Sequence, residues 1–285
     1  MKPSYVVSLS GGKDSTAILL MMLERGESVA DIVFFDGGWE FPQMHDHLAQ
    51  LEGYTGLKIT RLKPRSPFDL DFAKRDVFSK QTGEFRRSGR GWPSPLRRWC
   101  TREKINAIWA WCTGLTYKVE HLPVVQCIGY ALDEPERAEK HAAKKAKVHQ
   151  AFRYPLIEWG ITEDDALTYC KERGFTWGGL YEHFHRVSCF CCPLSSLDNL
   201  RKLRRHYPDL WARMLEMESW LPDGDIGRQF KEKTTVSDLD ARFAAEDVHE
   251  SRILSLLEMP GVRTHKNISE KCPNAVNSDG QGVNK

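Results

Sequence analysis

The sequence lacks long hydrophobic runs, has almost no net charge and contains no complete G-x-x-x-x-G-K-S/T phosphate-binding motif. Its longest apolar run, residues 17–23, is far too short to cross a bilayer, and no long apolar stretch precedes the first strand-like segment. We therefore expect a cytoplasmic protein with no membrane partner. A net charge of +2 over 285 residues argues neither for nor against a nucleic-acid partner, so local basic clusters must decide that question.

The chain has few cysteines, but their distribution is uneven. Three of the eight lie within VSCFCCP, as Cys189, Cys191 and Cys192. In a chain without a secretion signal, this spacing favours metal binding or thiol chemistry over a disulfide framework. Other cysteines, such as Cys127, stand at apolar positions, where we expect them to pack in the core.

Short apolar runs alternate with helix-forming runs in the first half of the chain. The pattern predicts strands at residues 5–9, 29–35, 57–62 and 124–130, and helices at residues 16–24 and 42–51. Alternating strands and helices predict an α/β fold with a Rossmann-like parallel sheet and helices on both of its faces. Residues 64–104 are rich in Arg, Gly and Pro, and they predict a long loop with little core of its own.

The second half of the chain has a mainly helical pattern. Helices are predicted over residues 163–173, 197–205 and 209–221. Thr162 is a suitable cap for the first, and Ser195 or Ser196 for the second. We accordingly divide the chain into three parts. They are a nucleotide-binding domain at residues 1–159, a mainly helical region with the cysteine cluster at 160–260, and a polar, flexible tail at 261–285.

The stretch SLSGGKDST lies between a predicted strand and a predicted helix, and its residue types suit a phosphate. Adjacent glycines let backbone N–H groups approach an anion closely, and the helix N-terminus behind them favours negative charge. Asp14 is unusual for a plain anion site, so it would cap the helix or help to hold a metal ion. A glycine turn with a capping side chain is the simpler alternative. The predicted phosphate-binding residues are Ser8, Ser10, Gly11, Gly12, Lys13, Asp14 and Ser15.

SGGKDS resembles the pyrophosphate-binding loop of the N-type ATP pyrophosphatases and of the related phosphoadenosine phosphosulfate (PAPS) reductases. The resemblance implies the adenine nucleotide α-hydrolase-like fold and an adenine-nucleotide site, with Asp36 of FFDGGWEFPQ contacting Mg2+ or ribose. IGYALDEPERA is similar to the family segment G-x-R-x-x-E/Q-S-x-x-R and matches it at Gly129 and Glu134. Ala131 stands where the first arginine would be, and Arg137, one position early, would contact the nucleotide phosphates. The likeness extends over about residues 6–193.

The cysteine segments are similar to an iron–sulfur ligand set of the same family. Its adenylylsulfate reductases hold a 4Fe-4S cluster with Cys-Cys-x-x-x-Lys and Cys-x-x-Cys motifs. RRWCTREK matches the first motif at Cys100 and Lys104, with Trp99 in place of one cysteine. CFCC matches the second motif at Cys189 and Cys192, and Cys191 is an additional thiol that could replace the missing ligand. Soft thiolates also suit zinc, and buried cysteines that bind no metal are the third alternative. The implied metal ligands are Cys100, Cys189, Cys191 and Cys192.

The resemblance implies two kinds of enzyme. One cleaves ATP to AMP and pyrophosphate with Mg2+, using Lys13, Asp14 and Arg137, and activates an acceptor, in some relatives for transfer of sulfur from a sulfur donor. The other reduces PAPS or adenylylsulfate with a C-terminal cysteine and a thioredoxin-like reductant; here Cys272 would have to serve, although SEKCPNAV departs from the family's Glu-Cys-Gly-x-His motif. We favour the first. A nucleotide-binding subunit without turnover is a third alternative, and the oligomeric state stays open.

A local basic cluster supports a nucleic-acid acceptor. RRSGR at residues 86–90 and the arginines at 97–98 lie close to Trp92 and Trp99 in the sequence. Guanidinium groups and stacking rings are typical of proteins that bind single-stranded nucleic acids. A solvated basic loop is the alternative interpretation.

Overall fold

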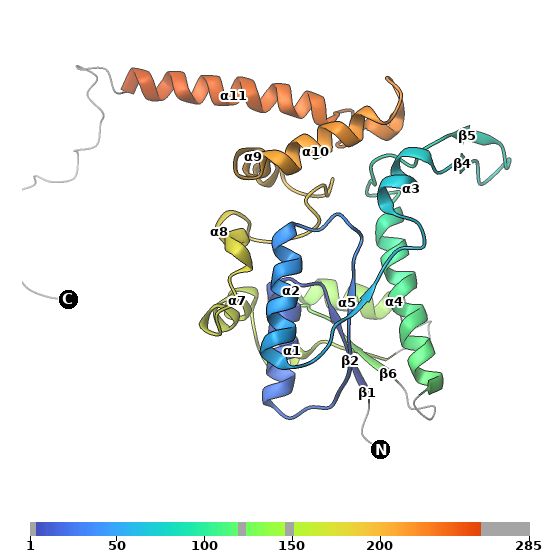
Figure 1. The fold of residues 1–285 in the computed structure, drawn as a ribbon, viewed down its shortest axis with the longest axis vertical. Helices are drawn as coiled ribbons and strands as arrows, with labels where there is room; N and C mark the ends of the chain where they lie inside the picture. Colours follow the sequence, from blue (N-terminus) through green and yellow to red (C-terminus); the bar gives the residue numbers. More distant parts are fainter. Residues whose placement is uncertain (1–3, 119–123, 146–150, 258–285) are drawn as a thin grey trace, which may run out of the picture. The chain divides into compact units, whose positions relative to one another are not determined.

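A five-stranded parallel sheet forms the centre of the fold (Figure 1). The computed structural model describes residues 4–118, 124–145 and 151–257. The strand order is β3-β2-β1-β6-β7, and every pairing in this sheet is parallel. The strands are β1 (Ser4–Leu9), β2 (Val29–Phe35), β3 (Thr60–Leu62), β6 (Val124–Cys127) and β7 (Ala151–Arg153).

The two central strands are apolar because both faces of the sheet are covered. Val6 and Val7 of β1 and Val33 of β2 are 0% exposed, as expected for a parallel sheet between helical layers. Val7 is paired with Ile32 on one side and Cys127 on the other, so β1 lies in the middle of the sheet. The predicted α/β parallel fold is confirmed.

The helices lie on both faces of this sheet. Right-handed crossovers place α1 (Lys13–Glu24) and α2 (Pro42–Thr55) on one face, and α4 (Trp99–Lys118) and α5 (Pro135–Lys145) on the other (Figure 1). The chain therefore leaves β1 toward β2 and later returns to its other side as β6. This reversal creates a topological switch point, where α/β proteins bind ligands beyond the carboxyl ends of the strands.

The prediction that residues 64–104 form a loop with little core is wrong. The segment contains α3 (Phe68–Lys74), a hairpin of β4 (Val77–Phe78) and β5 (Phe85–Arg87), and the start of α4. Phe72 and Trp92 are 0% and 1% exposed, and their rings meet edge-to-face with centroids 4.7 Å apart. The irregular spacing of these aromatic residues gave no helical or strand period, so the sequence pattern did not reveal the core that they form.

The part that follows β7 is mainly helical, as predicted. Thr162 and Asp165 form a capping box at the start of α7, and the Ser196 hydroxyl caps α9. These two caps explain why both helices begin where the sequence indicated. The elements are α6 (Pro155–Glu158), α7 (Glu163–Glu172), the 3-10 helix η1 (Trp177–Gly179), α8 (Leu180–His183), α9 (Leu197–His206), α10 (Pro208–Ser219) and the 3-10 helix η2 (Ile226–Arg228).

Contacts divide the chain into two units, Met1–Asp238 and Leu239–Lys285. The described part of the second unit is most of α11 (Val236–Leu257), in which Arg242 and Glu246 form an ion pair one turn apart. The boundary at residue 159 stays a prediction, and both the predicted tail at 261–285 and Cys272 lie outside the described residues. Within the described residues, no helix is both long enough and apolar enough to cross a membrane.

Candidate functional site

The SGGKDS loop lies at the carboxyl end of the central strand. β1 ends at Leu9, and α1 begins at Lys13 with Gly12 as its N-cap. Gly11 has φ +80°, and a Cβ atom there would lie 2.2 Å from the sulfur of Met44 on α2. The backbone conformation therefore favours glycine at this position, and a larger residue would also displace the Met44 side chain. The result is a helix N-terminus at the switch point of the sheet, the arrangement that favours binding of a phosphate.

Serine hydroxyls brace the loop from inside. Ser15 Oγ accepts a hydrogen bond from the Ser10 backbone N–H at 3.1 Å, lies 3.0 Å from Ser10 Oγ, and donates to the Gly12 carbonyl at 3.1 Å. Ser8 lies on β1 itself, where its hydroxyl accepts a hydrogen bond from Gln126 on β6. The hydroxyl groups of the predicted loop residues thus have a structural role, and their contact with phosphate stays a prediction.

Aromatic side chains from the second half of the chain hold the loop in place. Trp177 Nε1 donates a 2.7 Å hydrogen bond to the Gly11 carbonyl, and the Tyr181 hydroxyl accepts one of 2.8 Å from the Lys13 backbone N–H. His47 of α2 supports Trp177 in turn: the two rings stack with centroids 4.6 Å apart, and His47 Nε2 lies 3.0 Å from the Thr16 hydroxyl of α1. Burial lowers the pKa of His47 to about 4, so this ring is neutral at neutral pH.

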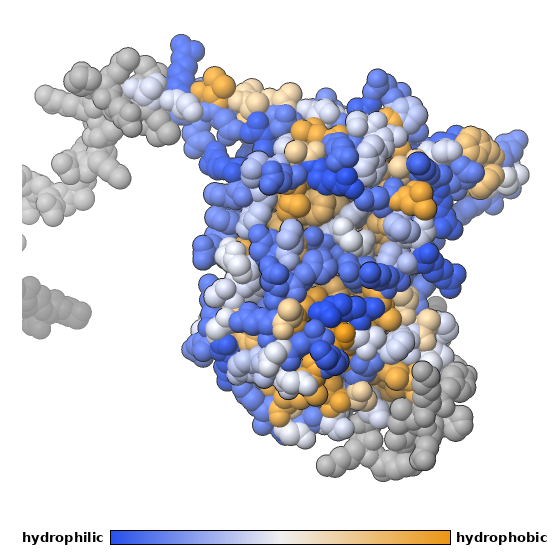
Figure 2. Space-filling model, viewed as in Figure 1, coloured by the Kyte–Doolittle hydropathy of each residue, from blue (hydrophilic) through white to orange (hydrophobic). Residues whose placement is uncertain are grey.

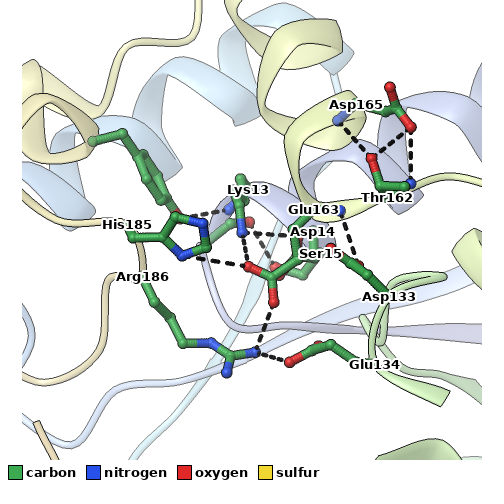
Figure 3. A network of polar contacts seen from close by, with 12 residues as sticks. Lys13, Asp14, Ser15, Asp133, Glu134, Thr162, Glu163, Asp165, His185 and Arg186 are labelled. Carbon is green, nitrogen blue, oxygen red and sulfur yellow. Dashed lines mark hydrogen bonds and ion pairs between the residues drawn. The ribbon is translucent and has the colours of Figure 1, made fainter.

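Lys13 is buried in an ion-pair network rather than extended into solvent (Figure 3). Its side chain is 2% exposed, and Nζ lies 2.5 Å from Glu163 Oε2 and 3.4 Å from Asp14 Oδ1. A buried ammonium is tolerated only when it is paired in this way. Glu163 is the first residue of α7, 150 positions from Lys13 in the chain.

Asp14 supplies the one side-chain carboxyl group of the SGGKDS loop, and its pKa is strongly shifted. Burial raises its pKa to about 6, the positive charge of Lys13 acts in the opposite direction, and the negative charge of Glu163 adds to the increase. Its Oδ1 atom is buried and makes only the 3.4 Å ion-pair contact, without a hydrogen bond. Gly129, which follows β6, packs against this residue; a Cβ at position 129 would lie 3.3 Å from Asp14 Cβ.

Two arginines form the outer part of the network. Arg186 Nη2 lies 2.6 Å from Glu134 Oε1 and 3.5 Å from Glu163 Oε1, and Arg137 Nη1 donates to the same oxygen of Glu134. Burial raises the pKa of Glu134, but the hydrogen bonds from Arg137 and Arg186 outweigh it and lower that pKa below its usual value. Both arginine side chains are 47% exposed, so the outer part of the network borders solvent.

Asp36 follows β2 at the same edge of the sheet. Its Oδ1 accepts a 2.9 Å hydrogen bond from the Gly38 N–H, and its own N–H donates to the Leu62 carbonyl at 2.7 Å. The residue lines a cavity of about 250 Å³ between the ends of β2 and β3. Contact of Asp36 with ribose or Mg2+ stays a prediction. The cavity is also lined by Gly37, Gly38, Lys63, Pro64, Pro67, Phe68 and Asp69.

The four cysteines predicted as metal ligands converge although the chain separates them into two segments. Burial raises the pKa of Cys100, Cys189 and Cys191, and the negative charge of neighbouring thiolates adds to the increase at each of these three. The Cys192 N–H donates to the Cys189 carbonyl at 3.2 Å, so the second segment forms a tight turn. Lys104, one turn after Cys100 on α4, exerts its charge on Cys189 as well.

The donors of this cluster fit a thiolate-bound metal, but their arrangement is not that of an assembled site. Among the described residues, no three Cys, His, Asp or Glu side chains are placed to hold a metal ion. Cys189 Sγ lies 4.0 Å from Glu40 Oε1, and burial raises the pKa of that carboxyl group. Convergence of soft donors supports iron–sulfur or zinc binding, and the ligand set stays a prediction.

The tryptophans predicted to stack on nucleic acid do not face solvent. Trp92 is 1% exposed and Trp99 is 7% exposed. Both rings pack against Trp39, at centroid distances of 6.4 and 5.5 Å. The prediction that these two rings stack on nucleic acid is therefore wrong. Burial in the aromatic cluster removes their apolar surface from water, which is more favourable than leaving it exposed.

Comparison with known families matches the phosphoadenosine phosphosulfate reductase domain over residues 4–195. The chain belongs to this PAPS reductase domain family. The matched region contains the SGGKDS loop, Asp36, Gly129 and the CFCC segment, and it ends before α9.

Individual relatives add little to this assignment. An uncharacterized protein of Methanocaldococcus jannaschii is 25% identical over 222 residues, which are 75% of this chain and 41% of that protein. The chain thus spans about two fifths of the length of that relative. A structure of the U34-tRNA thiolase NcsA from Methanococcus maripaludis with its 4Fe-4S cluster is 12% identical, with a TM-score of 0.40 over 93% of this chain and 78% of that one. A likeness this weak supports no functional argument.

Several residues of the site were not predicted from the sequence. Glu163, Tyr181 and Trp177 contact the loop from more than 140 positions away. The capping signal at residue 162 predicted the start of α7 and hence the place of Glu163 on it, but no local pattern indicated its partner. Tyr181 and Arg186 lie in LYEHFHRVSCFCCP, a segment similar to the same family, but the sequence assigned neither of them a role at the loop.

Proposed function

We propose that this PAPS reductase-family chain binds ATP at the SGGKDS loop and cleaves it to AMP and pyrophosphate. An acceptor oxygen would attack the α-phosphorus, the bond from that phosphorus to the bridging oxygen would break, and pyrophosphate would leave. The observation that supports this proposal is the loop itself, a glycine-dependent helix N-terminus at the switch point with a buried, ion-paired lysine.

The described residues suggest how this chemistry would be divided. Backbone N–H groups of the loop and Lys13 would bind the leaving pyrophosphate once the nucleotide competes with Glu163 for the ammonium group. Arg137, half exposed at the rim, would neutralise further phosphate charge, and Asp14 or Asp36 would hold the Mg2+ that accompanies ATP. The cavity beside Asp36 would receive the nucleoside.

Adenylation would prepare the acceptor for sulfur transfer. The oxygen that carries AMP becomes a good leaving group, and a sulfur nucleophile from a donor can replace it with release of AMP. The converging cysteines would hold a 4Fe-4S cluster, or else zinc, in support of this step. A nucleic acid is the acceptor class that we propose.

The family assignment itself favours a second candidate, reduction of PAPS or adenylylsulfate. Its cysteine nucleophile would have to be Cys272, which lies beyond the matched residues and outside the described ones. A thioredoxin-like reductant would then be the partner. The two candidates differ in the nucleotide that they bind, which makes them separable by experiment.

Calorimetric titration of the anaerobically purified protein with Mg–ATP and with PAPS tests the proposal, after its visible spectrum has been recorded. We expect tighter binding of ATP and release of pyrophosphate with an acceptor. Lys13→Ala should abolish both, and Lys140→Ala, an exposed lysine of α5, is the matched control. Preference for PAPS would favour the reductase, and unchanged turnover in Lys13→Ala would refute the loop assignment. Binding of ATP without turnover would indicate a nucleotide-binding subunit.

A further inference from the structure

The most basic part of the chain surrounds the β4–β5 hairpin. We refer to residues 74–98 as the basic hairpin segment. It has eight basic and two acidic residues, a net charge of +6, whereas the whole chain has +2. The rest of the protein is therefore net negative, and the positive charge is concentrated in one place. The basic residues are Lys74, Arg75, Lys80, Arg86, Arg87, Arg90, Arg97 and Arg98, and the acidic ones are Asp76 and Glu84.

Two aromatic rings are exposed at the centre of this charge. Phe78 and Phe85 are cross-strand partners in the hairpin and are 55% and 57% exposed. Their centroids lie 6.0 Å apart with an interplanar angle of 76°. Figure 2 shows hydrophobic side chains bordered by hydrophilic ones at the place that the hairpin occupies in Figure 1. Exposed paired rings are costly in water and indicate a partner that covers them.

The segment is attached to the core by only some of its arginines. Arg87 Nη1 forms a 2.5 Å ion pair with Asp225, and Arg90 pairs with Asp71 of α3. The Gly91 N–H donates to the Phe72 carbonyl at 3.0 Å. These contacts fix the base of the hairpin, so the charges that remain can be used by a partner.

The outer basic side chains are not held in ion pairs by the part of the chain that the structure describes. Lys80, Arg86, Arg97 and Arg98 are exposed, and none of them forms an ion pair with any residue that the structure describes. Among these four side chains, the one hydrogen bond to a described residue is that of Arg86 to Ser79 Oγ, at 3.4 Å. Lys80 and Arg86 belong to the same hairpin as the two exposed rings, and such a combination is complementary to a chain that alternates phosphates with flat apolar groups.

We propose that the basic hairpin segment docks a single-stranded stretch of RNA. Bases would stack on Phe78 and Phe85, and phosphates would pair with Lys80, Arg86 and Arg98. A duplex keeps its bases stacked inside and offers no ring faces, whereas RNA loops and ends present unstacked bases. An acidic peptide would use the charges but would leave the ring faces without a stacking partner. The inference concerns binding and does not depend on cleavage of ATP.

Fluorescence anisotropy with a labelled, mixed-sequence RNA of about 12 nucleotides tests this proposal. The double variant Phe78→Ala/Phe85→Ala should bind at least about tenfold more weakly. Tyr54→Ala is the matched control, because this ring is 56% exposed and lies on α2. The double variant Lys80→Gln/Arg86→Gln should flatten the plot of log affinity against log salt by about 1.4, as expected for two lost contacts to single-stranded phosphates.

The competing partners are arms of the same experiment. An RNA duplex and a polyglutamate peptide should each bind more weakly than the RNA. Single-stranded DNA of the same sequence offers the same bases and phosphates, so this arm separates RNA from DNA as the natural partner. Equal or tighter binding of any of these overturns the RNA assignment, as does undiminished binding by the phenylalanine variant. Circular dichroism of both double variants checks that these exposed substitutions leave the fold intact. Loss of RNA binding with ATP binding retained separates this proposal from that of the preceding subsection.

Discussion

Replacement of Asp14 by asparagine should stabilise the protein at neutral and alkaline pH. Burial raises the pKa of this carboxyl from 3.8 to about 6, so the folded state holds the proton more tightly than the unfolded state. Ionisation of Asp14 therefore lowers the free energy of unfolding, and this loss develops as the pH rises from about 4, the pKa in the unfolded state, to about 6, the pKa in the folded state. A shift of about two units corresponds to about 3 kcal/mol, because one unit is worth about 1.4 kcal/mol. The side chain is only 16% exposed, so solvent screens little of this effect.

Urea unfolding followed by tryptophan fluorescence at several pH values measures this difference. Asp14→Asn should exceed the wild type by about 3 kcal/mol near pH 8 and by about half as much near pH 5. The same variant should lose nucleotide turnover, since the ionised carboxylate is proposed to serve the reaction at the expense of stability. A smaller stability in the variant near pH 8 would refute the reasoning, because it would mean that the ionised carboxylate is net favourable there.

Asp165→Asn is the control with the opposite sign. Hydrogen bonds from Thr162 at the α7 capping box lower the pKa of the exposed Asp165. Its stabilisation is therefore present at neutral pH and lost as pH falls through the lowered pKa. This variant should be less stable than the wild type near pH 8, with a difference that shrinks in acid. The same pH trend in both variants would show that the measurement reports a global effect.

Three further substitutions test the geometry of the sites. Gly11→Ala should cost at least about 1 kcal/mol of unfolding free energy and abolish ATP binding, because its φ is +80° and a side chain from α2 fills the space; unchanged affinity by calorimetry would contradict the loop geometry. Glu163→Gln should lower the unfolding free energy in urea by about 3 kcal/mol, because it deprives the buried Lys13 of its closest partner; equal stability would show that the pair is not formed. Cys189→Ser should remove the iron or zinc found by elemental analysis, whereas Cys127→Ala in the core should retain it, and metal retained in both would exclude Cys189 as a ligand.

The sequence predicted the elements whose signals are local. The apolar runs of β1 and β2 are buried on both faces, so they are continuous rather than alternating, and Thr162 and Ser196 start their helices by hydrogen bonds to residues three positions away. The SGGKDS loop could be located for the same reason. Its glycine conformation and its position between a strand and a helix are properties of adjacent residues.

Segments 57–62 and 64–104 show where local reasoning failed. Only Thr60–Leu62 forms the third strand, because the preceding residues connect α2 to the sheet. Trp92 and Trp99 are buried by aromatic partners from other segments, while the exposed rings belong to Phe78 and Phe85. Which aromatic residues face water depends on packing between distant segments, and composition contains no information on it.

The sequence by itself determined the family, the parallel α/β fold and the position of the SGGKDS loop between a strand and a helix, because these depend on short patterns read within one segment. Tertiary structure alone decided that Lys13 is paired with Glu163, that Arg186 joins the same network and that Tyr181 holds the loop. It also decided that Cys100 lies near the CFCC segment. Each of these contacts joins residues far apart in the chain. These contacts depend on how α7, α8 and the cysteine turn, which all follow the last strand of the sheet, pack near the carboxyl ends of the strands, and no local pattern encodes that packing.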